Sequence, residues 1–256
     1  MRLEILGCSG GVALGNDTTS FLVDDDLLID AGTGVGRLSL DQCIKIKSIV
    51  LTHSHLDHVC HLPFLLNNTI GKTTESLHVY GLKETVASLK EYIFNGAIWP
   101  DFSVLPSVKK PSLIFHTFSI GDILSLEGKT LTVLPAEHTV PAVGFHIAKE
   151  ETCFAFSGDS SKNKSFWNAL NHLPPVEMLI VDNQYLESEK KLSLKAKHYY
   201  AKSLKKDFSL LNYSTSLYLT HLPPNGKEKV FKEAVDVFAP QKIHALREGQ
   251  IYNFPL

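Results

Sequence analysis

Short apolar runs bounded by turn residues recur along the chain and predict a protein rich in β-strands. Arg2–Leu6 alternates between polar and apolar positions, and Ser20–Val23 with Leu27–Asp30 predicts a hairpin across three consecutive aspartates. The segment Ser48–Thr52 consists mainly of apolar and β-branched residues, which is typical of a buried strand. Further strands are predicted at residues 77–80, in two pieces within 113–134, and at 143–148, 152–156, 178–182 and 216–220.

Between these strands, apolar residues recur at the spacing of an α-helix. Leu82, Val86, Leu89 and Ile93 follow steps of four, three and four residues, which marks an amphipathic helix. Comparable spacing predicts helices near residues 62–70, 166–170, 201–211 and 230–238. Hairpins punctuated by amphipathic helices indicate a layered α/β domain, and the order of elements in both halves fits an αββα sandwich. With 256 residues and 44% hydrophobic content, the chain suffices for a single domain over residues 1–256.

Four candidate metal ligands stand within six positions directly after the buried strand. They are His53, His55, Asp57 and His58. His53 and His55 can point the same way, because side chains of an extended segment alternate in direction. Imidazoles and a carboxylate at this density suit a transition metal such as zinc. Cys60 follows closely, either as a soft ligand or as a small buried residue, and we favour burial.

Three later strands also end in ligand-type residues. His138, Asp159 and His221 each stand just past a predicted strand. Ligands collect beyond strand ends in open sheets, so these residues are candidates for the same site. Their spacing alone does not establish that they meet the first cluster.

The pattern His53-Ser-His-Leu-Asp-His58 after a strand resembles the signature of the metallo-β-lactamase fold, and the resemblance extends along nearly the whole chain. This variant is similar to that of class II cyclic-nucleotide phosphodiesterases and of tRNA 3′-end-processing endonucleases. Leu6–Gly11 together with Leu28–Gly34 resembles the phosphodiesterases, whereas His138–Phe145 resembles the endonucleases. The resemblance implies the four-layer αββα architecture.

The resemblance also implies a dinuclear centre, and it distributes the ligands between two divalent ions. His53, His55 and His138 resemble the ligands of one ion, Asp57, His58 and His221 resemble those of the other, and Asp159 resembles the bridging carboxylate. Zinc is our first choice for the metal, with manganese or iron as alternatives. From such a centre we expect a metal-bridging hydroxide that attacks a phosphodiester, and we expect Asp57 to orient that hydroxide. Asp30 resembles a carboxylate that buttresses a histidine ligand.

Protonation of the leaving group needs an acid, and two residues are candidates. Asp182 ends a predicted strand, and His198 lies in Lys195–Tyr199. In the phosphodiesterase branch that the chain resembles, a glutamate and a Gly-His pair occupy the corresponding positions. Here the carboxylate is one methylene shorter and Lys197 stands in place of glycine, so the contact between Asp182 and His198 is open.

The non-periodic segment from Phe94 to Phe102 is rich in aromatic and turn residues. It resembles an Ile-Trp-Pro segment near the active site of class II phosphodiesterases. Trp99 or Phe102 could offer an apolar wall to a purine. Aromatic side chains that seal a satellite core are at least as good an explanation.

The favoured function is a cyclic-nucleotide phosphodiesterase of the 3′,5′-cAMP or cGMP class, with tRNA 3′-end processing as the alternative. Hydrolysis of another ester and non-catalytic binding rank lower. The net charge of −2 gives no global basic field, so the partner we expect is a small nucleotide phosphodiester rather than stably bound nucleic acid. Seven lysines between Lys190 and Lys206 are either a solvated helix face, which we favour, or an electrostatic funnel for an anion.

Four cysteines without CxxC spacing indicate reduced thiols. Neither a signal peptide nor an apolar run long enough to cross a bilayer is visible. We therefore expect a cytoplasmic protein with no membrane partner. The sequence leaves a homodimer open, because apolar surface for dimerisation cannot be distinguished from core.

Overall fold

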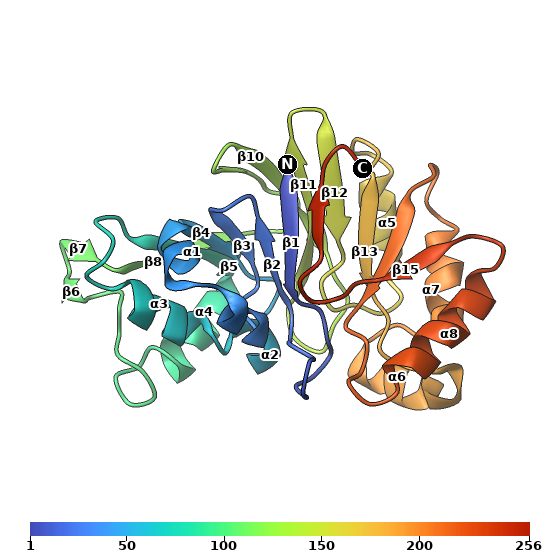
Figure 1. Ribbon diagram of the computed structural model, residues 1–256, viewed down its shortest axis with the longest axis horizontal. Helices are drawn as coiled ribbons and strands as arrows, with labels where there is room; N and C mark the ends of the chain where they lie inside the picture. The colour runs from blue at the N-terminus through green and yellow to red at the C-terminus, as the bar shows by residue number, and fades with distance from the viewer.

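The computed structural model describes residues 1–256 and contains two seven-stranded sheets packed face to face (Figure 1). The first sheet has the spatial order β16 (Ile251–Asn253), β1 (Arg2–Gly7), β2 (Ser20–Val23), β3 (Leu27–Ile29), β4 (Ser48–Val50), β5 (Leu77–Leu82) and β8 (Leu113–Phe118). The second has the order β15 (Ile243–Ala245), β14 (Ser216–Thr220), β13 (Met178–Asp182), β12 (Thr152–Phe156), β11 (Val143–Lys149), β10 (Lys129–Pro135) and β9 (Ile123–Leu126). A separate two-stranded ribbon pairs β6 (Pro106–Ser107) with β7 (Lys110–Pro111).

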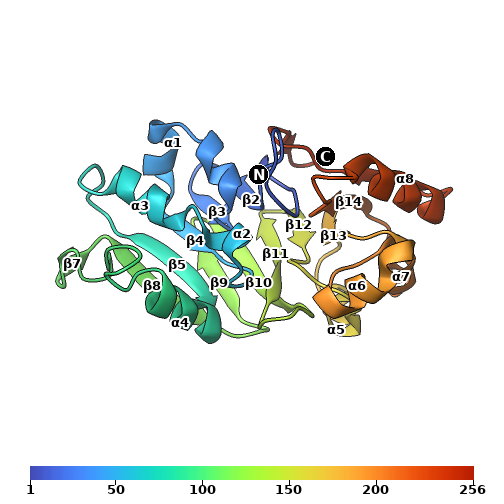
Figure 2. The same ribbon diagram turned by 90° about the horizontal axis from the view of Figure 1, so that it is seen from below.

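Helices cover the outer face of each sheet, as Figures 1 and 2 show. On the first sheet lie η1 (Thr33–Arg37), α1 (Leu40–Lys45), α2 (Leu56–Val59), α3 (Leu62–Thr69) and α4 (Lys83–Tyr92). On the second lie α5 (Lys164–Leu170), η2 (Glu187–Glu189), α6 (Lys190–Ala196), α7 (Ala201–Phe208) and α8 (Lys227–Phe238). Seen from below, α2 lies near the middle of the molecule, at the side of the first set of helices that is nearer to the second set (Figure 2).

Three hydrophobic clusters fill the three spaces between these layers. Residues of both sheets, such as Phe21 and Phe156, form the central cluster, and their rings meet edge to face with centroids 5.0 Å apart. A second cluster joins the first sheet to its helices, and a third, which contains the fully buried Trp167, joins the second sheet to its own. Apolar burial on both faces of each sheet thus confirms the predicted αββα sandwich.

Both sheets are mixed, and this arrangement determines where the site lies. β3, β4, β5 and β8 run parallel to one another, as do β12, β13, β14 and β15. Parallel strands end at the same edge of a sheet, where the connections to the following helices leave room for polar side chains. The candidate ligands that follow β4, β12 and β14 therefore emerge on shared edges.

The predicted elements differ from the observed ones mainly at their ends. β4 stops at Val50, so His53 and His55 lie in the loop before α2 and not on an extended strand end. Leu82 closes β5, and the helix predicted from it begins at Lys83. The two pieces predicted within residues 113–134 form three strands, β8, β9 and β10. β15 and β16 are only three residues long, which is too short for a periodic pattern, and the sequence predicts neither of them.

Candidate metal centre

The loop between β4 and α2 carries the densest group of donor side chains. Its backbone turns into α2 with His55 at the N-cap position, so that Asp57 and His58 lie in the single turn of that helix. His53 and His58 are completely buried, whereas the side chain of Asp57 remains 34% exposed. The loop therefore presents two buried imidazole donors next to a carboxylate that solvent can reach.

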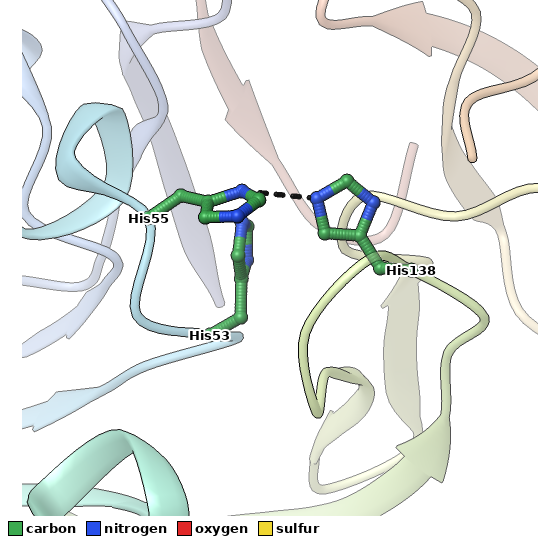
Figure 3. A group of neighbouring side chains, drawn as sticks. All are labelled: His53, His55 and His138. Atoms are coloured by element: carbon green, nitrogen blue, oxygen red, sulfur yellow. Dashed lines mark hydrogen bonds between the residues drawn. The ribbon is translucent and has the colours of Figure 1, made fainter. Parts of the chain in front are cut away.

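The first donor group consists of three histidines. Figure 3 shows His53 and His55 projecting from the loop toward His138, which follows β10. His138 Nε2 lies 3.0 Å from His55 Nδ1, and the ligand atoms of all three residues lie within 4.8 Å of one another. Three imidazole nitrogens this close together can share one transition-metal ion.

The second donor group contains two carboxylates and two histidines: Asp57, His58, Asp159 and His221. Asp159 Oδ2 lies 3.2 Å from His58 Nε2 and 3.3 Å from His221 Nε2. The same oxygen lies 3.8 Å from His53 Nε2, which belongs to the first group. Asp159 thus stands between the two groups, at the position where a bridging carboxylate is expected.

Buried atoms without hydrogen-bond partners show that these residues fit a metal ion. His53 Nε2, His58 Nε2 and Asp159 Oδ1 are all buried and unpartnered within the protein. An unsatisfied buried polar atom costs about 1–3 kcal/mol, so three of them in one place call for a bound cation. The seven candidate ligands therefore form a cage suited to two divalent ions.

The protonation states of the histidines favour cation binding at the first group. Burial lowers the pKa of His53 well below its usual value and lowers that of His138 to about 4. Both rings are therefore neutral at pH 7, which is the form that donates a lone pair to a metal. Burial opposes a charge on His58 as well, but Asp159 and Asp30 outweigh it and raise the pKa of this ring.

Asp30 supports His58 from behind. Its carboxylate lies 2.7 Å from His58 Nδ1 and accepts hydrogen bonds from the backbone N–H and the hydroxyl of Thr52, both at 2.8 Å. Asp30 adopts a left-handed backbone conformation with φ 57°, which aspartate tolerates better than most residues. An Nδ1–H held by this carboxylate leaves Nε2 free to face the site, so Asp30 fixes the tautomer of a ligand.

Asp182 and His198 are in direct contact, which answers the question that the shorter carboxylate left open. Asp182 Oδ2 lies 2.8 Å from His198 Nδ1 and also accepts the backbone N–H of Ser160. The His198 ring stacks on His221 with centroids 5.0 Å apart and meets His138 edge to face at 4.9 Å. Burial disfavours charge on His198, but Asp182 outweighs it and raises the pKa to about 9. A protonated imidazole therefore borders both donor groups.

The aromatic candidates pack into the protein. Phe102 is only 4% exposed and belongs to the cluster beneath the first sheet. Trp99 packs against the same cluster, with its ring centroid 5.1 Å from that of Phe64. These contacts support the alternative that both residues seal a core, and a contact of Trp99 with substrate stays a prediction.

Two further candidates take no part in the donor groups. Cys60 is half-buried, its Sγ lies 3.4 Å from His61 Nδ1, and it belongs to neither donor group. Among the lysines between Lys190 and Lys206, Lys202 forms an ion pair with Glu187 and Lys197 forms one with Glu137. Both pairs are exposed, as expected of a solvated surface.

Two contacts at the site escape sequence reasoning. The backbone carbonyl of Lys197 lies 3.2 Å from His138 Nδ1 and holds this ring as Asp30 holds His58. His221 adopts a left-handed conformation with φ 57°, and its N–H donates to the carbonyl of Cys8 in the N-terminal glycine turn. The amino-acid sequence does not specify which backbone carbonyl a histidine contacts or which dihedral angles it adopts, so only the folded structure shows these two contacts.

Comparison with known proteins places the chain in a family. Residues 26–236 match the family model described as the Beta-lactamase superfamily domain. Because the match covers most of the chain, the protein belongs to this family. Its fold and its set of histidine and aspartate donors are those of the family's metal-dependent hydrolases.

Two curated proteins and one solved structure illustrate what the chain is similar to. The chain is 27% identical to Ribonuclease Z of Pyrococcus abyssi over 141 residues, 54% of this chain and 43% of that protein. It is 29% identical to Ribonuclease Z of Clostridium beijerinckii over 181 residues, 65% of this chain and 56% of that protein. The chain therefore aligns with about half the length of these curated relatives. The structure of unliganded yeast PDE1 superposes with a TM-score of 0.83 at 16% identity over 98% of each chain, which shows a shared fold.

No helix of this protein combines the length and the apolar character needed to cross a bilayer.

Proposed function

We propose that this protein is a dinuclear metal-dependent phosphodiesterase that hydrolyses a small phosphodiester of the cyclic-nucleotide class. The observation that carries the proposal is the position of Asp159, whose Oδ2 lies within 3.8 Å of histidine nitrogens from both donor groups. Two divalent ions held by these groups would activate water and neutralise the negative charge of a phosphodiester.

The protein's own residues supply the remaining chemistry. Asp182 holds His198 by its Nδ1, so the Nε2 proton is available to an oxygen that leaves from the phosphorus. Asp57, with a partly exposed carboxylate 3.6 Å from His58 Nε2, is placed to accept a proton from the attacking water. An acid and a base at one site suit hydrolysis in which the attacking water loses a proton and the leaving oxygen gains one.

Processing of tRNA 3′ ends is the second candidate, because the sequence relatives are Ribonuclease Z proteins. The net charge of −2 gives no broad basic field for binding a polyanion, which favours the small substrate. Cyclic-nucleotide specificity and zinc as the native metal are both parts of the proposal.

Activity of metal-analysed protein on a substrate panel tests the proposal. The panel contains 3′,5′-cAMP, 3′,5′-cGMP, 2′,3′-cyclic nucleotides, bis(p-nitrophenyl) phosphate and precursor tRNA. We expect metal-dependent turnover of a cyclic nucleotide that changes little with salt. Cleavage of precursor tRNA alone, with binding that weakens steeply as salt rises, would transfer the assignment to the second candidate. Two bound metals without hydrolysis of any phosphodiester would exclude both.

A further inference from the structure

A cavity of about 340 Å³ opens directly beside the first donor group. Its wall includes His138 together with the apolar side chains of Leu82, Ile120, Val140 and Pro141. Cavities of this size and mixed character hold small ligands. Two charged residues also line it, Glu137 and Lys197, and the side chain of neither has a role in the chemistry described above.

Lys197 reaches this cavity from an unusual backbone position. It ends α6 in a left-handed conformation with φ 56° and ψ 50°, which glycine adopts more readily than lysine. Its carbonyl contacts His138 Nδ1, while its ammonium lies 2.5 Å from a carboxylate oxygen of Glu137. The main chain of this residue thus supports a metal ligand, and its side chain places a positive charge near that ligand.

The ion pair between Lys197 and Glu137 is open to exchange. Their side chains are 39% and 51% exposed, so water screens the pair and its net contribution to stability is small. A lysine ammonium has three donors, and Glu137 uses only one of them through the single short contact. An anionic ligand in the cavity would bind the Lys197 ammonium either by displacing the exposed Glu137 carboxylate or by binding beside it.

We propose that Lys197 and Glu137 form an anion-selecting subsite, in which Lys197 binds a phosphoryl oxygen of the substrate and Glu137 competes with the substrate for that ammonium. The proposal rests on the proposed function, because the ligand is the phosphodiester of that reaction. The subsite favours anionic diesters over neutral esters. Glu137 weakens the binding of the anion and thereby sets its affinity.

Opposite effects of two substitutions test this subsite. Lys197→Gly should raise KM for bis(p-nitrophenyl) phosphate roughly three- to tenfold, because a charge-assisted contact is lost. Metal content and kcat should persist, since glycine keeps the carbonyl on His138 and favours the left-handed conformation. Glu137→Gln should lower KM about two- to fivefold by removing the competing charge. Lys197→Arg should retain most of the affinity.

Lys195→Ala is the matched control, because Lys195 is exposed in the same lysine-rich segment and forms no ion pair. This variant should leave KM unchanged. If the ion pair were only structural, Lys197→Gly and Glu137→Gln would shift KM and the melting temperature in the same direction, which would overturn the proposal. An unchanged KM in Lys197→Gly would overturn it as well.

Binding of inorganic phosphate, measured by titration calorimetry on metal-loaded protein, separates this proposal from the proposed function. Phosphate should bind Lys197→Gly roughly three- to tenfold more weakly and Glu137→Gln more tightly. This pattern without hydrolysis of any diester would refute the proposed function and leave the subsite in place. Equal phosphate affinity in all variants would refute the subsite even if the wild-type protein is an active phosphodiesterase.

Discussion

Substitution of Asp30 by asparagine tests how the second donor group is held. Asp30 is completely buried and accepts three hydrogen bonds, one from His58 and two from Thr52. An asparagine oxygen can still accept the backbone N–H of Thr52, and the Thr52 hydroxyl can reverse its role. His58 Nδ1 then faces an amide N–H and must become an acceptor, which moves the ring proton to Nε2.

That proton would occupy the atom that faces Asp159 and the metal site. A hydrogen bond to a charged group contributes about 1.5–3 kcal/mol, which corresponds to roughly a 10- to 100-fold loss of metal affinity at the second group. Asparagine tolerates the left-handed backbone at this position, so we expect Asp30→Asn to fold.

Metal content by mass spectrometry and metal titration by calorimetry measure this effect. We expect Asp30→Asn to lose one of two bound ions under limiting metal while circular dichroism stays unchanged. Asp24→Asn is the matched control, because Asp24 is also left-handed, with φ 52°, but pairs with Lys129 and Lys149 away from the site. Wild-type metal affinity in Asp30→Asn would refute the reasoning about the tautomer.

Four more predictions follow from the site and its surroundings. His198→Gln should lower kcat about 10²- to 10⁴-fold with both metals retained, and loss of metal would show that His198 is a ligand. Phe102→Ala should lower the free energy of unfolding by about 3–5 kcal/mol in denaturant titration, whereas an unchanged value would place the ring outside the core. Trp99→Ala should raise KM if the ring stacks on a base, which is worth about 1–3 kcal/mol, and an unchanged KM would limit Trp99 to packing against Phe64. Chelation of the metals should lower the melting temperature reversibly, because the buried Nε2 atoms of His53 and His58 are then left without a partner, and an unaffected temperature would argue against bound metal.

Much of the fold is predictable because its signals are local. Alternation in Arg2–Leu6 and the apolar run after Ser48 predict β1 and β4, and the spacing of Val86 and Leu89 predicts α4. Each signal reflects burial of one face of one element. The two sheets pack because both are apolar on their inner faces, and that patterning is present in the sequence.

Positions of donor residues at strand ends are likewise predictable, but their convergence is not. His55 and His138 lie 83 positions apart and meet only because the two sheets face each other. Phe102 belongs to a segment without periodicity, so its burial has no signature in the sequence. The support of His138 by a carbonyl of Lys197 depends on a dihedral angle, which residue identity does not encode.

Anomalous diffraction from crystals of metal-loaded protein tests the central claim most directly. We expect two peaks about 3.5–4 Å apart, the spacing typical of dinuclear hydrolytic centres. One peak should contact His53, His55 and His138, the other Asp57, His58 and His221, and Asp159 should touch both. A single peak, or two peaks that share no ligand, would contradict the account.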